Sequence, residues 1–227
     1  MKLSFCTTCM NRVEHLKKTL PHNIELLNKF DNSELVIVNY DSKDDLHEYI
    51  INNYSNYINN KIKYIKVENK NYFDSRHAKN IAHKCSIGDV LINLDADNFL
   101  TETVILEIIR NFSINMNYLL NCSYNEGFIV ISRDNFFKLG GYNEKMQGYG
   151  LEDVDLIFRA FYLLSLTFRY FDNDLVKVIE HSNDDRTINF ENKDFSQNFN
   201  RALHQKYMNE KILNPNLYNN IEWGIYE

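Results

Sequence analysis

The chain has 227 residues, of which 44% are hydrophobic and 25% charged, so it can bury roughly 70% of its unfolded surface in a core. With 7 Gly and 2 Pro, the composition excludes collagen-like and disordered classes and provides no flexible interdomain linker. The formal net charge of -6 argues against a nucleic-acid-binding surface, because phosphate backbones favour clustered Lys and Arg. A single domain over residues 1–227 is therefore predicted.

Strands alternate with helices in the first half of the chain. The run at 34–38 is almost wholly apolar, which is typical of a strand covered on both faces. Apolar side chains spaced 3-4-4-3 between Val13 and Leu27 mark one face of a helix. Strands are predicted at 3–7, 34–38, 62–67 and 89–94, and helices at 13–27, 46–50 and 75–85. This alternation favours a mainly parallel sheet, with the turns after Thr7, Val38 and Leu94 converging on one ligand cleft.

The second half mixes short elements. A strand is predicted at 128–132, followed by a short helix at 134–139 that stops at Gly140-Gly141. A further helix is predicted at 151–164, strands at 167–171 and 176–180, and a final helix along the stripe of Phe195, Phe199, Leu203 and Tyr207.

The apolar run at the N-terminus is too short for a signal peptide, and no stretch approaches the roughly 20 apolar residues of a membrane span. A soluble, cytoplasmic protein is expected, with at most peripheral membrane contact through the short basic clusters at 17–18 and 61–66. The four cysteines are expected to be reduced. Cys6-Thr-Thr-Cys9 has the spacing of redox and zinc motifs, but no second cysteine pair accompanies it, so structural thiols are predicted.

Two aspartates stand where the fourth predicted strand ends. In extended backbone, Asp95 and Asp97 point the same way past Ala96. Carboxylate oxygens are ligands for Mg²⁺ and Mn²⁺, which in turn bind substrate phosphates. An ordinary polar turn at a strand end carries the same pattern, so the neighbouring motifs have to decide between the two interpretations.

A glycine-containing loop precedes an acidic helix start. Gly148 and Gly150 come directly before Glu152, Asp153 and Asp155. As a purely structural feature, the acids would complement the positive end of the helix and the glycines would form a turn. Acids beside glycines, where the backbone can approach a ligand closely, favour a binding site instead.

The order of these motifs resembles the GT-A-fold glycosyltransferases of the family-2 type, whose motif series also occurs in β-1,4-galactosyltransferases and bacterial chondroitin-type polymerases. The resemblance spans almost the whole chain. It is carried by Cys6-Thr-Thr-Cys-Met-Asn-Arg12, Tyr40-Asp-Ser-Lys-Asp-Asp45, Ser75-Arg-His-Ala-Lys-Asn80, Leu94-Asp-Ala-Asp-Asn98, Gly140-Gly-Tyr142, Gly148-Tyr-Gly-Leu-Glu-Asp153 and His181.

The resemblance implies an α/β, Rossmann-like GT-A fold in one domain, with a nucleotide-binding half at 1–98 and an acceptor-binding and catalytic half at 99–227. Asp97 is expected to bind the metal directly, and Asp95 to bind the metal, a metal-bound water or the ribose. His181 would complete a site suited to Mn²⁺ more than Mg²⁺. The residues implied to face the nucleotide are Thr7, Asn11, Arg12, Asp41, Asp44, Arg76 and Asn80.

By the same resemblance, Asp153 is the catalytic base of an inverting transferase, and Gly148, Tyr149 and Glu152 bind the acceptor. The implied reaction moves a sugar from a UDP-sugar to a hydroxyl of a saccharide, a lipid-linked saccharide or a glycoprotein. A single displacement from the far face of the sugar inverts the anomeric configuration. The metal stabilises the departing diphosphate, and the carboxylate takes the proton of the attacking hydroxyl.

Two departures from the family pattern leave the donor open. Tyr149 stands where many relatives have Trp, and Asn39-Tyr40 replaces an acidic pair, which leaves the uracil contact open between Asp41 and Asp44. The alternatives are a retaining transferase or a nucleotidyltransferase on a related fold, and a non-catalytic nucleotide-sugar-binding protein. A haloacid-dehalogenase-like phosphatase is disfavoured, because its Asp-x-Asp motif should follow the first strand.

Overall fold

A computed structural model describes residues 1–122, 125–171, 175–180, 182, 185, 187–191 and 193–226. Parallel strands form the first half of its central sheet. They are β1 (Leu3–Cys9), β2 (Ser33–Tyr40), β3 (Ile62–Val67) and β4 (Val90–Asn93). All residues of β2 are buried, as its apolar run predicted.

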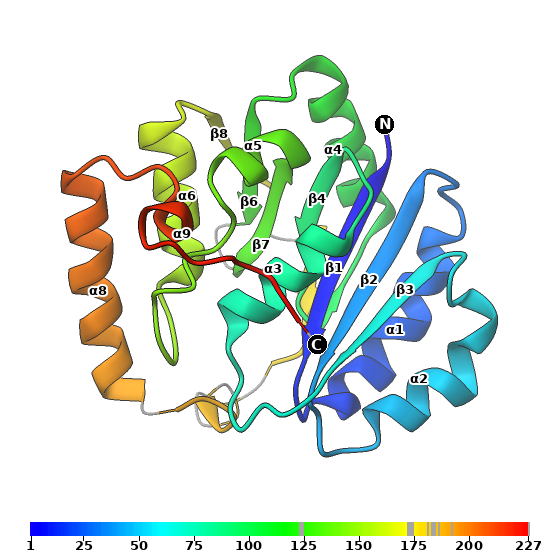
Figure 1. The fold of residues 1–227 in the computed structure, drawn as a ribbon. Coiled ribbons are helices and arrows are strands. Elements are labelled where there is room, and N and C mark those ends of the chain that lie inside the picture. The colour runs from blue at the N-terminus through cyan, green and yellow to red at the C-terminus, as the bar shows by residue number, and fades with distance from the viewer. Residues whose placement is uncertain are drawn as a thin grey trace.

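The second half of the sheet continues from β4 and is partly antiparallel. It contains β6 (Tyr118–Cys122), β7 (Asn125–Ser132) and β8 (Thr167–Phe171). The complete order is β3-β2-β1-β4-β7-β6-β8 (Figure 1). β7 runs antiparallel to β4 and β6, whereas β8 runs parallel to β6. The predicted α/β class with a mainly parallel sheet is thereby confirmed.

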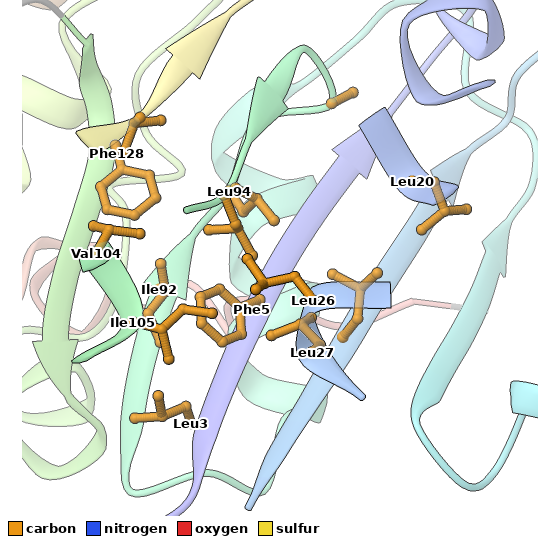
Figure 2. Close-up of a cluster of buried hydrophobic side chains, with 14 of the residues drawn as sticks. Leu3, Phe5, Leu20, Leu26, Leu27, Ile92, Leu94, Val104, Ile105 and Phe128 are labelled. Carbon is orange, nitrogen blue, oxygen red and sulfur yellow. The ribbon is translucent and has the colours of Figure 1, made fainter. Parts of the chain in front are cut away.

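Successive side chains of β1 and β4 point to opposite faces of the sheet, and on both faces they are apolar and buried. Helices therefore cover both faces. The larger core lies under α1 (Val13–Leu27), α2 (Leu46–Tyr54) and α4 (Glu102–Ile114). Figure 2 shows Phe5 and Ile92 of the sheet packed between Leu27 of α1 and Ile105 of α4. The opposite face is covered by α3 (Ser75–Cys85), α5 (Arg133–Lys138) and α6 (Glu152–Phe158).

The remaining elements are short or lie at the edge. A 3-10 turn, η1, follows α2 at Ser55–Tyr57, and a small sheet pairs β5 (Asn98–Phe99) with β9 (Lys177–Val178). Beside α6 lies α8 (Lys193–Asn209), followed by α9 (Pro215–Tyr218) (Figure 1). No helix within the described ranges combines the length and hydrophobicity needed to cross a membrane.

The structure corrects two predicted elements and adds two that were not predicted. The helix predicted at 151–164 is α6 followed by a π-helical turn, η2 (Arg159–Leu163), at a buried arginine. The strand predicted at 176–180 reduces to β9. Neither α4 nor β6 was predicted, although Thr101 caps α4 by accepting a hydrogen bond from the Val104 N–H at 3.2 Å, a signal present in the sequence.

The cysteines fit the structural interpretation. All four are free thiols, and Cys6 and Cys9 are buried within β1. Burial raises the pKa of Cys9 to about 12, which disfavours both the thiolate needed for redox chemistry and zinc binding.

Candidate active site

The carboxyl ends of β1 and β4 meet at one edge of the sheet. The Thr7 hydroxyl donates to the Leu94 carbonyl at 2.8 Å, and the Leu94 N–H donates to the Cys6 carbonyl at 2.9 Å. These bonds place Asp95 beside the end of β1. They also give the buried Thr7 side chain a structural partner, while its predicted nucleotide contact stays a prediction.

The turns after β1 and β2 are bound to each other. Asn11 has a left-handed φ of 54°; its N–H donates to Ser42 Oγ at 3.0 Å, and its Oδ1 accepts from the Lys43 N–H at 2.6 Å. Asp44 accepts from the first N–H of α1, that of Val13, at 2.9 Å. The first two predicted turns therefore lie together, while the ligand cleft between them and the turn after Leu94 stays a prediction.

Asp41 and Arg12 flank this pair of turns. Asp41 accepts from Lys43 Nζ at 2.7 Å and from the Lys70 N–H at 2.7 Å. Its desolvation would raise the pKa, but these two donors outweigh it and lower the pKa of Asp41. Arg12 donates to the Asp185 carbonyl. An ionised Asp41 at the end of β2 is suited to accept hydrogen bonds from a base or a ribose.

Asp95 and Asp97 lie in the loop between β4 and β5. Asp95 accepts from Asn93 Nδ2 at 3.0 Å, and Gly127 of β7 packs so closely that a Cβ there would stand 2.5 Å from Asp95 Oδ2. Burial raises the pKa of Asp95, and Asp97 raises it further, against the opposing effect of Lys79. The negative charges of the two aspartates therefore oppose each other.

The carboxylate oxygens of Asp95 and Asp97 are suitable ligands for a divalent cation. Within the described part of the chain, no group of three His, Cys, Asp or Glu side chains is placed to hold a metal. The third predicted ligand, His181, lies outside the described residues. The chain just before it runs beside Asp97, whose carbonyl accepts from the Ile179 N–H at 2.9 Å. Among the described residues, both polar atoms of the buried Asn98 side chain are without a hydrogen-bond partner.

Lys79 of α3 binds the acids at the start of α6. Its ammonium group lies 2.8 and 3.0 Å from the two carboxylate oxygens of Asp153 and 3.4 Å from Glu152 Oε1. Burial alone would raise the pKa of Glu152, but Lys79 and Arg76 outweigh it and lower this pKa. Burial, reinforced by Glu152 and Asp95, raises the pKa of Asp153 to about 7 despite Lys79. Asp153 thus has the proton affinity of a general base at neutral pH.

Arg76 and Asn80 on the same helix bind the glycine loops. Arg76 donates to the Gly148 carbonyl at 2.6 Å and pairs with Asp74 at 2.9 Å. Asn80 is fully buried; its amide donates to the Tyr142 carbonyl at 2.9 Å and to Glu144 at 2.7 Å. Both amide hydrogens of Asn80 are thus used within the protein, which does not support its predicted contact with the nucleotide.

The predicted acceptor residues lie between α3 and α8. Gly148 has a φ of 55°, and a Cβ there would stand 2.6 Å from the Glu191 carbonyl oxygen, so glycine is required. The Tyr149 N–H donates to Ser196 Oγ at 3.1 Å, and the Tyr149 ring meets Phe190 edge-on at 5.2 Å. Glu152 accepts from the Ser75 hydroxyl at 3.0 Å. The loop from 148 to 152 is therefore fixed from both sides.

Asp155, the third acid of this helix start, has a structural role. It binds Arg159 Nε at 2.8 Å and His204 Nδ1 at 2.9 Å, and Arg159 also donates to the Leu139 and Gly141 carbonyls at 2.8 and 3.0 Å. This cluster joins α5, α6 and α8 behind the acidic site.

Replacing Arg159 by Met is expected to lower the free energy of unfolding by roughly 3 to 5 kcal/mol, because Asp155 would stay buried without its main cation. Urea unfolding measures this change. In the control, Arg110→Met removes an exposed arginine paired with Glu107 at 3.2 Å and should cost roughly 0.5 kcal/mol or less. Equal effects of the two substitutions would contradict a supporting role of the Asp155 cluster.

A family model covers most of the residues of this site. The family model of glycosyl transferase family 2 matches residues 4–154, more than half of the 227-residue chain. The chain belongs to glycosyl transferase family 2. The matched range of this family-2 chain includes all the acids at the carboxyl edge of the sheet and ends just after Asp153.

Solved structures with a similar fold include a mannosyltransferase and two proteins in complex with UDP or a UDP-sugar. A mannosyltransferase from Pyrobaculum calidifontis in complex with GDP-Man and Mn²⁺ aligns with a TM-score of 0.67 at 13% identity, over 80% of this chain and 58% of its own. S. aureus TarS 1-349 in complex with UDP-GlcNAc aligns with 0.61 at 16% identity, over 80% and 60%. GalNAc-T7 with UDP, GalNAc and Mn²⁺ aligns with 0.65 at 15% identity, over 81% and 44%.

These similarities show the fold, which is the GT-A, Rossmann-like fold that the resemblance implied. The family-2 chain spans less than two thirds of the length of each of the three structures. No curated protein matches it in sequence.

Sequence reasoning missed Lys79. The signal was a second stripe on α3, opposite the predicted apolar face of Ala78, Ile81 and Ala82. This stripe consists of polar residues one turn apart, and all of its members are buried: Ser75, Arg76, Lys79 and Asn80. A buried polar stripe indicates partners on another segment, which here are the glycine loops and the acids of α6.

Proposed function

We propose that this chain is a metal-dependent, inverting glycosyltransferase that transfers a sugar from a UDP-sugar to an acceptor hydroxyl. The observation that carries the proposal is Asp153, a carboxylate at the carboxyl edge of the sheet whose pKa is raised to about 7. A carboxylic acid that titrates near neutral pH, beside a second acidic cluster, is the expected signature of a general base.

Asp153 would take the proton as the acceptor oxygen attacks the anomeric carbon. The acceptor O–H bond and the bond from the anomeric carbon to the diphosphate break, while the glycosidic bond and the Asp153 O–H bond form. Base and leaving group act on opposite faces of the sugar, so an α-linked donor gives a β-linked product. The tether of residues 148–152 to α3 and α8 would hold this base in place.

Asp97 and Asp95 would hold the divalent cation, together with His181. Among the described residues, three carboxylates at this edge interact with Lys79, those of Asp95, Glu152 and Asp153, and Arg76 is a second cation that acts on Glu152. An anionic nucleoside diphosphate would be repelled there without a cation. When bound, Mn²⁺ or Mg²⁺ stabilises the charge that develops on the departing diphosphate.

The turns after β1 and β2 would form the nucleotide pocket, with Asn11, Arg12, Asp41 and Asp44 at its wall. This assigns nucleotide binding to residues 1–98, and acceptor binding and catalysis to residues 99–227. Support for UDP comes from the similar fold of TarS, whose structure contains UDP-GlcNAc, and of GalNAc-T7, whose structure contains UDP and Mn²⁺. Acceptors would be a saccharide, a lipid-linked saccharide or a glycoprotein.

Product analysis tests this proposal. The chain is incubated with UDP-glucose, UDP-galactose, UDP-GlcNAc or UDP-GalNAc and a set of p-nitrophenyl glycosides, with Mn²⁺ or with EDTA. We expect one donor to give a β-linked product, identified by its anomeric proton coupling in NMR, in the presence of Mn²⁺ only. An α-linked product would contradict inversion and favour a retaining transferase. Full activity in EDTA would contradict the metal dependence.

A further inference from the structure

Lys79 is a buried cation in contact with two carboxylates and an aromatic ring. Its side chain is 7% exposed and its ammonium group lies 5.1 Å from the centre of the Tyr142 ring. Both carboxylate oxygens of Asp153 lie within 3.0 Å of this ammonium group, and Glu152 Oε1 lies at 3.4 Å. Burial would lower the pKa of Lys79, but Asp153 and Glu152 outweigh it and raise this pKa, so the group stays charged.

The charges around Asp153 come from three directions. Glu152 is its neighbour on α6, Asp95 approaches from the loop after β4, and Lys79 approaches from α3. Among the groups of the described residues that act on Asp153, Lys79 is the cation. Arg76, the nearby arginine of α3, is directed instead to the Gly148 carbonyl and to Asp74. Without Lys79, the carboxylate of Asp153 would face two other carboxylates.

We propose that Lys79 is a positioning residue for the catalytic base: its ammonium group holds both oxygens of Asp153 in one orientation and keeps this carboxylate ionised against Glu152 and Asp95. The inference rests on the proposed function of Asp153. Lys79 neither gives nor takes a proton in the reaction. It acts through Asp153, so its loss should change the proton affinity of the base.

Lys84 on the same helix provides a matched control. It also packs over an aromatic ring, that of Trp223 at 5.2 Å, and it donates to the Trp223 carbonyl at 2.8 Å. Neither of these two contacts involves a carboxylate. Lys79→Met and Lys84→Met therefore remove the same chemical group from α3, but only the first removes a counter-charge from Asp153.

Carbon-13 NMR of the aspartate carboxyl groups tests the inference on the donor-free protein. We expect Lys79→Met to raise the pKa of Asp153 by roughly 1 to 3 pH units, because an adjacent opposite charge lowers a carboxyl pKa by this amount. Lys79→Arg should restore the wild-type value, and Lys84→Met should leave it unchanged. A folded Lys79→Met protein with an unchanged pKa of Asp153 would overturn the inference.

The pH profile gives the kinetic counterpart. Turnover requires ionised Asp153, so the pH range in which turnover rises should shift to higher pH as the pKa of Asp153 rises. Turnover of Lys79→Met at pH 7 should fall roughly tenfold for each pH unit of that shift, and Lys79→Arg should restore it. If turnover of Lys79→Met rises over the same pH range as that of the wild type, the positioning role of Lys79 is contradicted.

If Lys79→Met does not fold, the wild-type protein still allows a test. The nitrogen-15 resonance of Lys79 Nζ should shift at the same pH at which the Asp153 carboxyl carbon titrates, and an insensitive resonance would overturn the inference. These readouts need neither donor nor acceptor. Failure of the base assignment, seen as normal turnover in Asp153→Asn, is therefore distinguishable from failure of the Lys79 contact.

Discussion

Replacing Asp153 by Asn is expected to lower turnover by roughly 10² to 10⁴, because the side chain keeps its shape but loses the oxygen that accepts the proton. Affinity for the UDP-sugar should be preserved, since the proposed role places Asp153 on the acceptor side of the sugar. The wild-type rate should rise as the pH rises through about 7, the value to which burial and the neighbouring acids raise the pKa of Asp153. This limb should vanish in the variant. Steady-state kinetics and donor calorimetry measure both effects.

Asp134→Asn is the matched control for this substitution. Asp134 is the second residue of α5, as Asp153 is of α6, but it is exposed and lies outside the site. It should leave turnover and the pH profile unchanged. Near-normal turnover in Asp153→Asn would refute the base assignment and direct attention to Glu152, the neighbouring acid that Ser75 and Lys79 hold in the same site.

The second large effect is expected at Asp97. Asp97→Asn should reduce Mn²⁺-dependent turnover by at least roughly 10²-fold, because metal stabilisation of the leaving group contributes several kcal/mol and each 1.36 kcal/mol is a factor of ten. Calorimetry should show that Mn²⁺ strengthens UDP binding to the wild type and not to the variant. In EDTA, the two proteins should bind UDP equally weakly.

Asp89→Asn controls for the loss of a carboxylate from this strand. Asp89 precedes β4 at its opposite end, where its carboxylate accepts from the Lys2 N–H at 2.7 Å. This variant should keep the full response to Mn²⁺. The metal assignment would be wrong if wild-type UDP binding were as strong in EDTA as in Mn²⁺, or if Asp97→Asn left the Mn²⁺ effect intact.

Much of the fold could be predicted because its signals are local. The apolar run at 34–38 identified a strand buried on both faces, and the spacing from Val13 to Leu27 identified the helix that covers the larger core. Parallel strands place their carboxyl ends at one edge, so the turns after the first two strands could be predicted to meet, with Asp95 at the same edge. Two elements were not predicted. The helix α4 was missed although its buried residues Val104, Ile105, Ile108 and Phe112 recur with helical spacing, and β6 is a short strand buried along its whole length, so it shows no alternation of apolar and polar residues. The strand predicted at 176–180 was too long, because only the two residues of β9 pair with β5.

The same distinction between local and long-range signals applies to the residues of the site. The sequence by itself determined that acids follow β4 and begin α6, because a motif of adjacent residues records this directly. Only the tertiary structure decided which partners they meet: Lys79 reaches Asp153 across 74 positions, and the Asn80 amide is taken by Tyr142 and Glu144. Such contacts depend on how α3 packs against the glycine loops and on the rotamers this packing allows, and neither is encoded in the local pattern of a single segment.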